Sequence, residues 1–290
     1  MTLTPVLPAP PPAGSRRPGG ILARMSRRTR AALAVGVVAV VGLTTFLVVD
    51  RGPAPPPPSP SGEYMPVGDL PGWHQVLAED FLTDTAPGEF PGPYADHWTS
   101  YDGFPDTFGH ADYTNDIITV RNGVLDEYLH TNAEGRAQAA APVPYVSEKW
   151  AGQTYGRFSV RFRADPLQGF GTGWLLWPDS DNWDEGEMDF PEGRLDGQIS
   201  GYNHCIGNPR KICGQIHTGV TYTDWHTATI EWLPGKLSYY LDGALMESYT
   251  DNVPDTPFHW VLQTGTRAVA PDPDVAGHVE IDWVAIYTPA

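Results

Sequence analysis

The segment YGRFSVRFRA, residues 155–164, alternates apolar and polar side chains along its whole length. Phe158, Val160 and Phe162 are separated by a serine and an arginine. A period of two places such apolar side chains on one face of a β-strand, whereas a helix would need a period near 3.6. The segment is therefore predicted to be a strand with one buried face.

Two further stretches, one on each side of residues 155–164, predict β-hairpins. IITVRNGVLDEYLH, residues 117–130, carries Asn122-Gly123 between two apolar runs, which is a strong signal for a tight hairpin turn. HTATIEWLPGKLSYYLDG, residues 226–243, divides into two strand patterns at a Leu-Pro-Gly-Lys turn. Antiparallel pairing is therefore expected on both sides of the chain's midpoint.

The last alternating stretch is HVEIDWVAIY, residues 278–287, where we expect Val279, Ile281 and Trp283 on one buried face. Residues 64–290 show no convincing helical period, and Gly and Pro interrupt them regularly. Antiparallel strands of this total length fit one domain better than two. The predicted fold is all-β, a jelly-roll β-sandwich of two antiparallel sheets with a concave substrate cleft.

The N-terminal part has a different composition. Residues 1–30 are rich in Pro, Gly and Arg and are expected to form a disordered cytoplasmic tail. Residues 31–49 carry no charge, and a helix of this length would span about 28 Å, close to the ~30 Å hydrocarbon core of a bilayer. Residues 50–63 read as a Pro-rich linker, which leaves residues 64–290 as the folded domain.

The arginines before residue 31 predict that the N-terminus stays in the cytoplasm and that the folded domain lies outside. A cleaved signal peptide is the alternative, with an apolar region of ~7–15 residues and a small-residue cleavage site. The run here is longer and lacks an A-x-A site, which favours an uncleaved signal-anchor. The domain is therefore expected at the cell membrane, single-pass and extracytoplasmic, or secreted if the signal is cleaved.

The net charge of the folded domain limits the classes of partner that it can bind. The whole chain carries −17 and residues 1–61 carry +6, so residues 62–290 carry −23. Such a domain is a poor partner for nucleic acid or anionic lipid, and we expect a monomer that binds a neutral ligand.

Cys205 and Cys213 are the only cysteines and lack the ligand cluster of a zinc site, so a disulfide bordering a cleft is predicted.

The stretch GEMDFPEG, residues 186–193, crowds three acids into six positions. Glu187 and Asp189 share one face of a strand, while a regular strand would place Glu192 on the opposite face. A β-bulge near Pro191 would restore Glu192 to the face of the other two, and bulges accept proline. All three carboxyl groups are thus predicted to face one groove.

Crowded carboxylates repel one another, which keeps at least one of them protonated. Glycoside cleavage needs this asymmetry, because one carboxylic acid and one carboxylate flank the bond. The alternatives from the residues alone are a calcium site or a solvated acidic edge. The preceding PDSDNWDEGE resembles an EF-hand loop, but Trp183 occupies a required ligand position. No cofactor is expected, and a structural calcium stays an alternative.

Several motifs together resemble glycoside hydrolase family 16, the laminarinase and β-glucanase group of jelly-roll endoglycosidases. GEMDFPE is similar to its E-x-D-x-x-E signature. The other matching motifs, in chain order, are TYGRFSVRFRADP, GTGWLLWP, DWHTATIEWLPGKLSYYLDG and IDWVAIY. The resemblance covers roughly residues 70–288.

The resemblance implies a retaining double displacement on a polysaccharide. Glu187 matches the nucleophile, Glu192 the general acid and base, and Asp189 the acid that tunes the nucleophile. Four further residues match positions near the substrate: Trp174, Trp183, His204 and Gln263. For His204 a structural role beside the disulfide is an equal alternative, and Trp177 is expected in the core.

The acidic domain favours neutral β-glucans, with β-1,3- or mixed linkages, over sulfated polyanions. An agarase-type specificity and a transglycosylase, which use the same residues, are alternatives within this family. A jelly roll that binds carbohydrate without cleaving it is a further alternative.

Overall fold

The computed structural model describes residues 59–290. The predicted tail, residues 1–30, and the predicted anchor, residues 31–49, lie outside this range. From residue 59 to the C-terminus, no helix has the length and apolar character needed to cross a bilayer. The helices of this part are single 3₁₀ turns, namely η2 (Gly92–Tyr94), η3 (Asn115–Ile117) and η4 (Trp183–Glu185).

The larger of the two main sheets has eleven strands. Their order is β16 (Ala244–Tyr249), β15 (Lys236–Leu241), β14 (His226–Leu233), β9 (Gly156–Ala164), β18 (Gly277–Pro289), β6 (Val124–Thr131), β7 (Ala137–Ala139), β4 (Ala111–Tyr113) and β3 (Phe104–Pro105). Two strands lie off this path: β1 (Trp73–Glu79) pairs with β18, and β5 (Ile118–Arg121) pairs with β6. The pairing is antiparallel except between β4 and β7, which run parallel.

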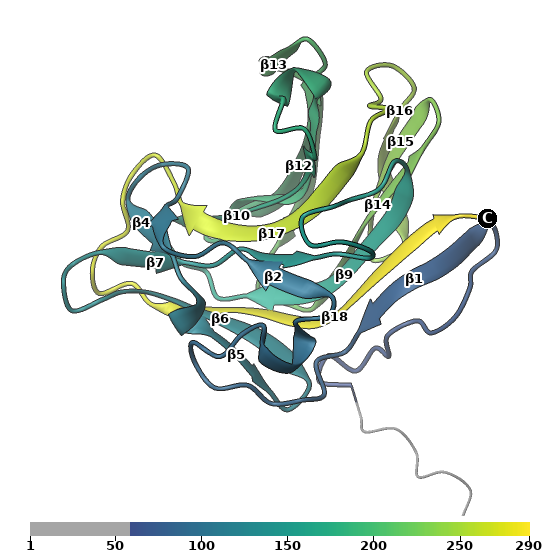
Figure 1. The fold of residues 1–290 in the computed structure, drawn as a ribbon. Helices are drawn as coiled ribbons and strands as arrows, with labels where there is room; N and C mark the ends of the chain where they lie inside the picture. Colours follow the sequence, from purple (N-terminus) through teal and green to yellow (C-terminus); the bar gives the residue numbers. More distant parts are fainter. Residues whose placement is uncertain (1–58) are drawn as a thin grey trace, which may run out of the picture. The chain divides into compact units, whose positions relative to one another are not determined.

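The smaller main sheet has five antiparallel strands and carries the site. Their order is β13 (Asn208–Thr221), β12 (Gln198–Cys205), β11 (Glu187–Arg194), β10 (Phe170–Pro178) and β17 (Phe258–Thr266). In Figure 1, β12 and β13 rise steeply from β10 and β17, so this sheet is strongly curved. A short ribbon of β2 (Trp98–Ser100) and β8 (Pro142–Pro144) completes the strands. The predicted jelly-roll sandwich is confirmed.

Aromatic side chains from the two main sheets meet in the core between them. Phe162 of β9 packs edge-on against Trp174 of β10 at 5.0 Å, and Phe158 packs against Trp260 of β17 at 5.6 Å. All four side chains are buried, at 3% exposure or less. Burying large aromatic rings of this kind contributes most of the core's stabilisation.

The hairpins occur as predicted. β5 and β6 are joined at Asn122-Gly123, where both residues have positive φ, at 56° and 78°. This is the backbone that a two-residue type I′ turn requires, and Asn-Gly adopts it readily. β14 and β15 pair from Leu233 and Lys236 outward, as the Leu-Pro-Gly-Lys turn indicates.

One expectation about a shared face of β18 is wrong, although Trp283 is buried as expected, at 2% exposure. Trp283 was expected on the same face as Ile281, but the register of β18 shifts between these two residues. Trp283 therefore packs with Trp73 in a small second cluster instead of the main core. Residues 59–63 cover this outer face as well, since the indole N–H of Trp283 donates to the carbonyl of Glu63. The face of β18 that points away from the main core is thus partly buried as well.

Candidate active site

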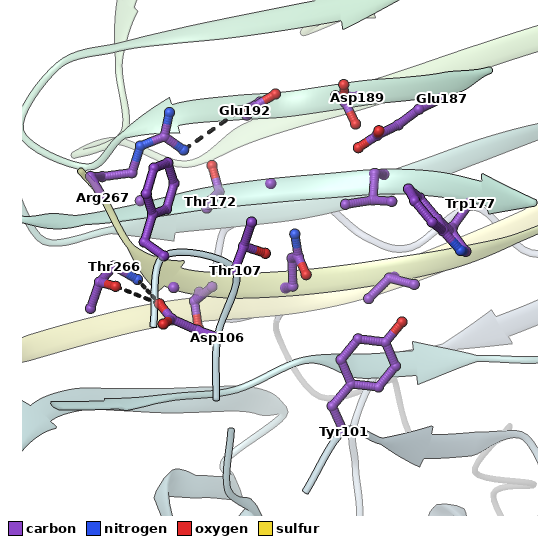
Figure 2. Close-up of a pocket in the computed structure, with 18 of the residues that line it drawn as sticks. Tyr101, Asp106, Thr107, Thr172, Trp177, Glu187, Asp189, Glu192, Thr266 and Arg267 are labelled. Carbon is purple, nitrogen blue, oxygen red and sulfur yellow. Dashed lines mark hydrogen bonds and ion pairs between the residues drawn. The ribbon is translucent and has the colours of Figure 1, made fainter. Parts of the chain in front are cut away.

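The concave face of the five-stranded sheet holds a cleft of about 480 Å³. Its floor is formed by β10, β11 and β17, and segments that lie far away in the sequence form its walls. Figure 2 shows the acids of β11 on one side of the cleft and Tyr101 and Asp106 on the other. Both apolar and polar side chains line it, as in sites that bind small molecules or sugars.

The three acids of β11 all line this cleft. The pairing of β11 with β12 shifts register between Asp189 and Glu192, so the strand is irregular where the sequence predicts a bulge. On the other side, Glu192 pairs with Gly173 and Asp189 pairs with Leu175, again with a shift between them. Figure 2 shows the three carboxyl groups along β11. The break in period therefore brings Glu192 to the face of Glu187 and Asp189.

Glu187 receives a hydrogen bond from the residue that opens η4. The indole Nε1–H of Trp183 donates to Oε2 of Glu187 at 2.5 Å. Asn182 caps the short helix by accepting from the backbone N–H of Asp184. Gly186 then turns the chain into β11 with φ 103°, a conformation that favours glycine. The sequence NWDEGE thus aims one indole N–H at the first acid.

Asp189 is the most deeply buried of the three acids, at 1% exposure. Burial raises the pKa of Asp189 well above its usual range, and the charges of Glu187 and Glu192 raise it further. The Nδ1 of His204 lies 2.6 Å from the carbonyl oxygen of Pro209, so Nδ1 must carry a proton. The other nitrogen, Nε2, lies 3.1 Å from Oδ2 of Asp189. The imidazole is therefore a direct neighbour of the buried carboxyl group.

Burial also raises the pKa of Glu192, while the nearby Arg267 guanidinium opposes that rise. The Nη1 of Arg267 lies 3.5 Å from Oε1 of Glu192. The strand therefore carries carboxyl groups in different environments. That difference is what acid–base chemistry with paired carboxyl groups requires.

Of the residues predicted to bind substrate, Trp183, His204 and Gln263 line the cleft. Trp183 stacks with Trp177 at 6.3 Å between ring centres. His204 lines the cleft and lies beside the acids, with its Nε2 3.1 Å from Oδ2 of Asp189. The side-chain oxygen of Gln263 accepts a hydrogen bond from the hydroxyl of Tyr113 at 3.0 Å.

The predicted placements of Trp174 and Trp177 are wrong. Trp174 is fully buried in the core against Phe162, whereas Trp177 is partly exposed and lines the cleft. Alternation along β10 turns Gly173, Leu175 and Trp177 toward the cleft and Trp174 toward the other sheet. Positions 174 and 177 are three apart, so they must lie on opposite faces of a strand.

Several cleft residues were not predicted because they come from segments far from the acids in the sequence. They are Tyr101, Asp106, Thr107, Phe108, Tyr113 and Arg267. Their positions depend on tertiary hydrogen bonds, such as those that Asp106 accepts from the backbone N–H and the hydroxyl of Thr266, at 2.6 and 2.5 Å. The sequence around residue 106 gives no signal of this contact.

The disulfide between Cys205 and Cys213 is present as predicted. It closes the connection of β12 and β13, which borders the acids. Beside it, the carbonyl of Pro209 in β13 accepts from Nδ1 of His204 in β12, and the N–H of Gly207 donates to the carbonyl of Asp184 at 2.7 Å. The stapled loop therefore supports both His204 and the helix that carries Trp183.

One group of side chains has the arrangement of potential metal ligands. Oxygen and nitrogen atoms of Glu187, Asp189 and His204 all lie within 4.8 Å of one another. The EF-hand-like stretch before them is engaged in protein contacts instead. Asp179 contacts His259 at 2.9 Å, and Glu185 accepts hydrogen bonds from the hydroxyls of Ser180 and Thr256.

Comparison with known proteins agrees with this geometry. The family model for "Glycosyl hydrolases family 16" matches residues 145–285. The β-glucanase of Rhodothermus marinus is 31% identical over 204 residues, which is 58% of this chain and 69% of that protein. The β-glucanase of Paenibacillus polymyxa is 34% identical over 77 residues, 26% of this chain and 31% of that protein.

Solved structures share the fold. The laminarinase of Rhodothermus marinus has a TM-score of 0.61 at 24% identity and covers 76% of this chain and 99% of its own. The Bacillus licheniformis β-glucanase has a TM-score of 0.59 at 16% identity, over 77% of this chain and all of its own. The fold and the relatives define a glycoside hydrolase. The chain belongs to glycosyl hydrolases family 16.

Proposed function

We propose that this protein is an endo-acting β-glucanase that hydrolyses β-1,3- or mixed-linkage β-glucan with retention of configuration. The observation that carries the proposal is the convergence of Glu187, Asp189 and Glu192 on one cleft. The relatives named β-glucanase and the laminarinase-like fold support the substrate class. Glucan cleavage by retention proceeds through a glycosyl-enzyme and needs two carboxyl groups with different protonation states.

In the first step Glu187 attacks the anomeric carbon and forms a covalent glycosyl ester. Glu192 gives its proton to the glycosidic oxygen, so the leaving sugar departs as an alcohol. The raised pKa of Glu192 supports this role, because it keeps a proton available on the buried acid. In the second step Glu192, now ionised, takes a proton from water, and the hydroxide releases the sugar from Glu187.

Asp189 supports the nucleophile in this proposal. Its raised pKa favours a carboxylic acid beside Glu187. A protonated Asp189 donates a hydrogen bond to a neighbouring oxygen or to Nε2 of His204, and this avoids a second negative charge in the cleft. When the glycosyl ester breaks, a hydrogen bond to Glu187 stabilises the carboxylate that leaves.

Trp177 and Trp183 provide the aromatic faces that the C–H surfaces of a glucose ring need, and both line the cleft. Gln263 supplies a polar group for sugar hydroxyls from the cleft floor. The net charge of −23 on residues 62–290 supports a neutral polysaccharide over a sulfated one, because like charges repel.

The test uses the full chain, assayed for new reducing ends on β-1,3-glucan and on mixed-linkage β-glucan. The proposal expects short oligosaccharides early in the reaction, and Glu187→Gln should abolish turnover while oligosaccharide binding persists. Cleavage of agarose alone would reassign the substrate, and longer products from one oligosaccharide would indicate a transglycosylase. If wild type and Glu187→Gln bind alike and neither cleaves, the protein is a carbohydrate-binding jelly roll.

The proposal also covers the domain organisation and the location of the protein. Residues 31–49 anchor residues 64–290, the catalytic domain, outside the cell membrane, through the linker predicted at 50–63, of which residues 59–63 pack on the domain. The support is the uncharged run and the arginines before it. Membrane fractionation of the full chain tests this, since release into the medium would indicate cleavage. Chromatography with light scattering tests the expected monomer.

The chemistry proposed here uses carboxyl groups and water, so we expect no cofactor. Treatment with EDTA should leave turnover unchanged. A structural calcium would instead appear as a lower melting temperature in EDTA that added calcium restores.

A further inference from the structure

Arg267 lies just beyond β17, and its side chain crosses the cleft floor toward β11. β10 lies between these two strands in the sheet. The crossing point on β10 is Gly171, where an added Cβ would lie 2.6 Å from Cδ of Arg267. A side chain at position 171 would therefore occupy the path of the arginine. The missing side chain at Gly171 leaves this path open. Figure 2 shows the contact of Arg267 with Glu192.

The guanidinium has a partner on each side. Its Nη1 lies 3.5 Å from Oε1 of Glu192, and its Cζ lies 5.5 Å from the ring centre of Phe108. Stacking over an aromatic ring holds a planar guanidinium in place. Phe108 belongs to the loop that Asp106 fastens to Thr266, the residue immediately before Arg267. The ring, the guanidinium and the acid thus form one connected arrangement.

The other ionisable groups near Glu192 act on its pKa in two directions: Glu187 raises it, and His204 lowers it by less than Arg267 does. Glu187 and Asp189 lie on the same strand and disfavour ionisation of Glu192. From β12, His204 faces it, and the buried hydroxyl of Tyr222 lies beyond β13. Among the cleft-lining residues of the described chain, Arg267 is the only arginine or lysine.

We propose that Arg267 is a positioning residue, which crosses β10 over Gly171 and holds Glu192 in place for its acid–base work. This inference rests on the proposed function, because Glu192 has that work only in a glycoside hydrolase. At 3.5 Å the guanidinium is close enough to the carboxyl group of Glu192 to influence its charge.

A pH dependence follows from this arrangement. The alkaline limb of kcat/KM reports the acid that must be protonated in the free enzyme, which is Glu192 here. A neighbouring cation favours the ionised form of a carboxyl group. Removing the cation should therefore raise the pKa of Glu192 and move the alkaline limb to higher pH.

The test compares wild type with Arg267→Gln and Arg267→Lys. In Arg267→Gln the alkaline limb of kcat/KM should rise by about one pH unit, the lower end of the usual range for a carboxyl group beside an arginine. Arg267→Lys keeps the cation, so its limb should lie closer to that of wild type. Arg163→Gln is the matched control, because Arg163 also pairs with a carboxylate, Glu280, and stacks over an aromatic ring, that of Trp225, but does not line the cleft.

An unchanged alkaline limb in Arg267→Gln, or an equal shift in Arg163→Gln, would overturn the inference. A titration of the Glu192 carboxyl carbon by ¹³C NMR gives the same comparison without turnover. Its midpoint should rise in Arg267→Gln, and a constant midpoint would also overturn the inference. Failure of the wild type to cleave glucan would instead count against the proposed function, while the NMR midpoint would still report on Arg267.

Discussion

The indole nitrogen of Trp183 donates a hydrogen bond to Oε2 of Glu187 over 2.5 Å. Trp183 lies only four positions before Glu187 and begins the single turn η4, which is capped at Asn182 and closed at Gly186. The same ring stacks with Trp177 and lines the cleft. One side chain therefore orients the proposed nucleophile and offers an apolar surface to a sugar.

Trp183→Phe should separate these two roles, because it keeps an aromatic ring and removes the N–H. A hydrogen bond to a charged group contributes ~1.5 kcal/mol or more, so kcat should fall on the order of tenfold while KM changes little. Trp177→Phe is the control, since the indole N–H of Trp177 donates to Asp181 and not to an acid of β11. Equal kcat in Trp183→Phe and wild type would show that this contact does not orient Glu187.

Trp174 and Trp177 should respond differently to truncation. Trp177→Ala removes a cleft surface, and we expect KM to rise about tenfold with little change in stability. Trp174→Ala removes a ring that is fully buried, and it should lower the free energy of unfolding by about 3–5 kcal/mol. Urea denaturation and steady-state kinetics on both variants check this. A large KM effect from Trp174→Ala with normal stability would contradict the assignment.

Glu127 should make stability depend on pH. It is fully buried on β6, and its Oε2 accepts a hydrogen bond from the hydroxyl of Thr264, a residue of the cleft floor, at 2.8 Å. Burial raises the pKa of Glu127 from 4.5 to about 8. Below 4.5 the group is protonated whether the chain is folded or unfolded. Between 4.5 and about 8 only the unfolded chain releases the proton, so rising pH removes stability through this window.

This loss amounts to at most about 1.4 kcal/mol per pH unit for a single group. Glu127→Gln cannot ionise, so the difference in unfolding free energy between about pH 5 and about pH 7.5 should be smaller than in wild type. Urea denaturation at both pH values measures it. The same pH dependence in both proteins would mean that Glu127 does not keep its proton on folding.

The disulfide should contribute to stability more than to catalysis. Cys205 and Cys213 are eight positions apart, and closing a loop of this length stabilises a fold by about 2.5 kcal/mol on the chain-entropy model. The double variant Cys205→Ser/Cys213→Ser avoids a free thiol and should lose about that much unfolding free energy. Turnover at low temperature should fall less, because the carbonyl of Pro209 still contacts His204. An unchanged melting temperature would contradict this.

Local patterns were sufficient to predict much of this fold. The period of two gave the strands, Asn122-Gly123 gave a hairpin, and Pro191 beside three acids indicated the irregularity that unites them. The pattern failed at GTGWLLWP, where both faces of β10 carry large apolar side chains. There the period separates Trp174 from Trp177 but does not say which of them faces the core.

The rest of the site depends on tertiary structure. Arg267 reaches Glu192 across Gly171 of the adjacent strand, where an added Cβ would lie 2.6 Å from Cδ of the arginine. Phe108 approaches Arg267 beside the contact between Asp106 and Thr266, which are 160 positions apart. Contacts at such separations leave no trace in local periodicity.

The most direct test of the account is to trap the glycosyl-enzyme. A 2-deoxy-2-fluoro β-glucosyl or laminaribiosyl compound with a good leaving group would slow the second step, and mass spectrometry of the digested protein would locate the sugar. The account predicts one sugar ester on Glu187, and no labelling of Glu187→Gln. A label on Glu192 or outside the cleft would contradict it, as would hydrolysis whose first product has the inverted anomeric configuration.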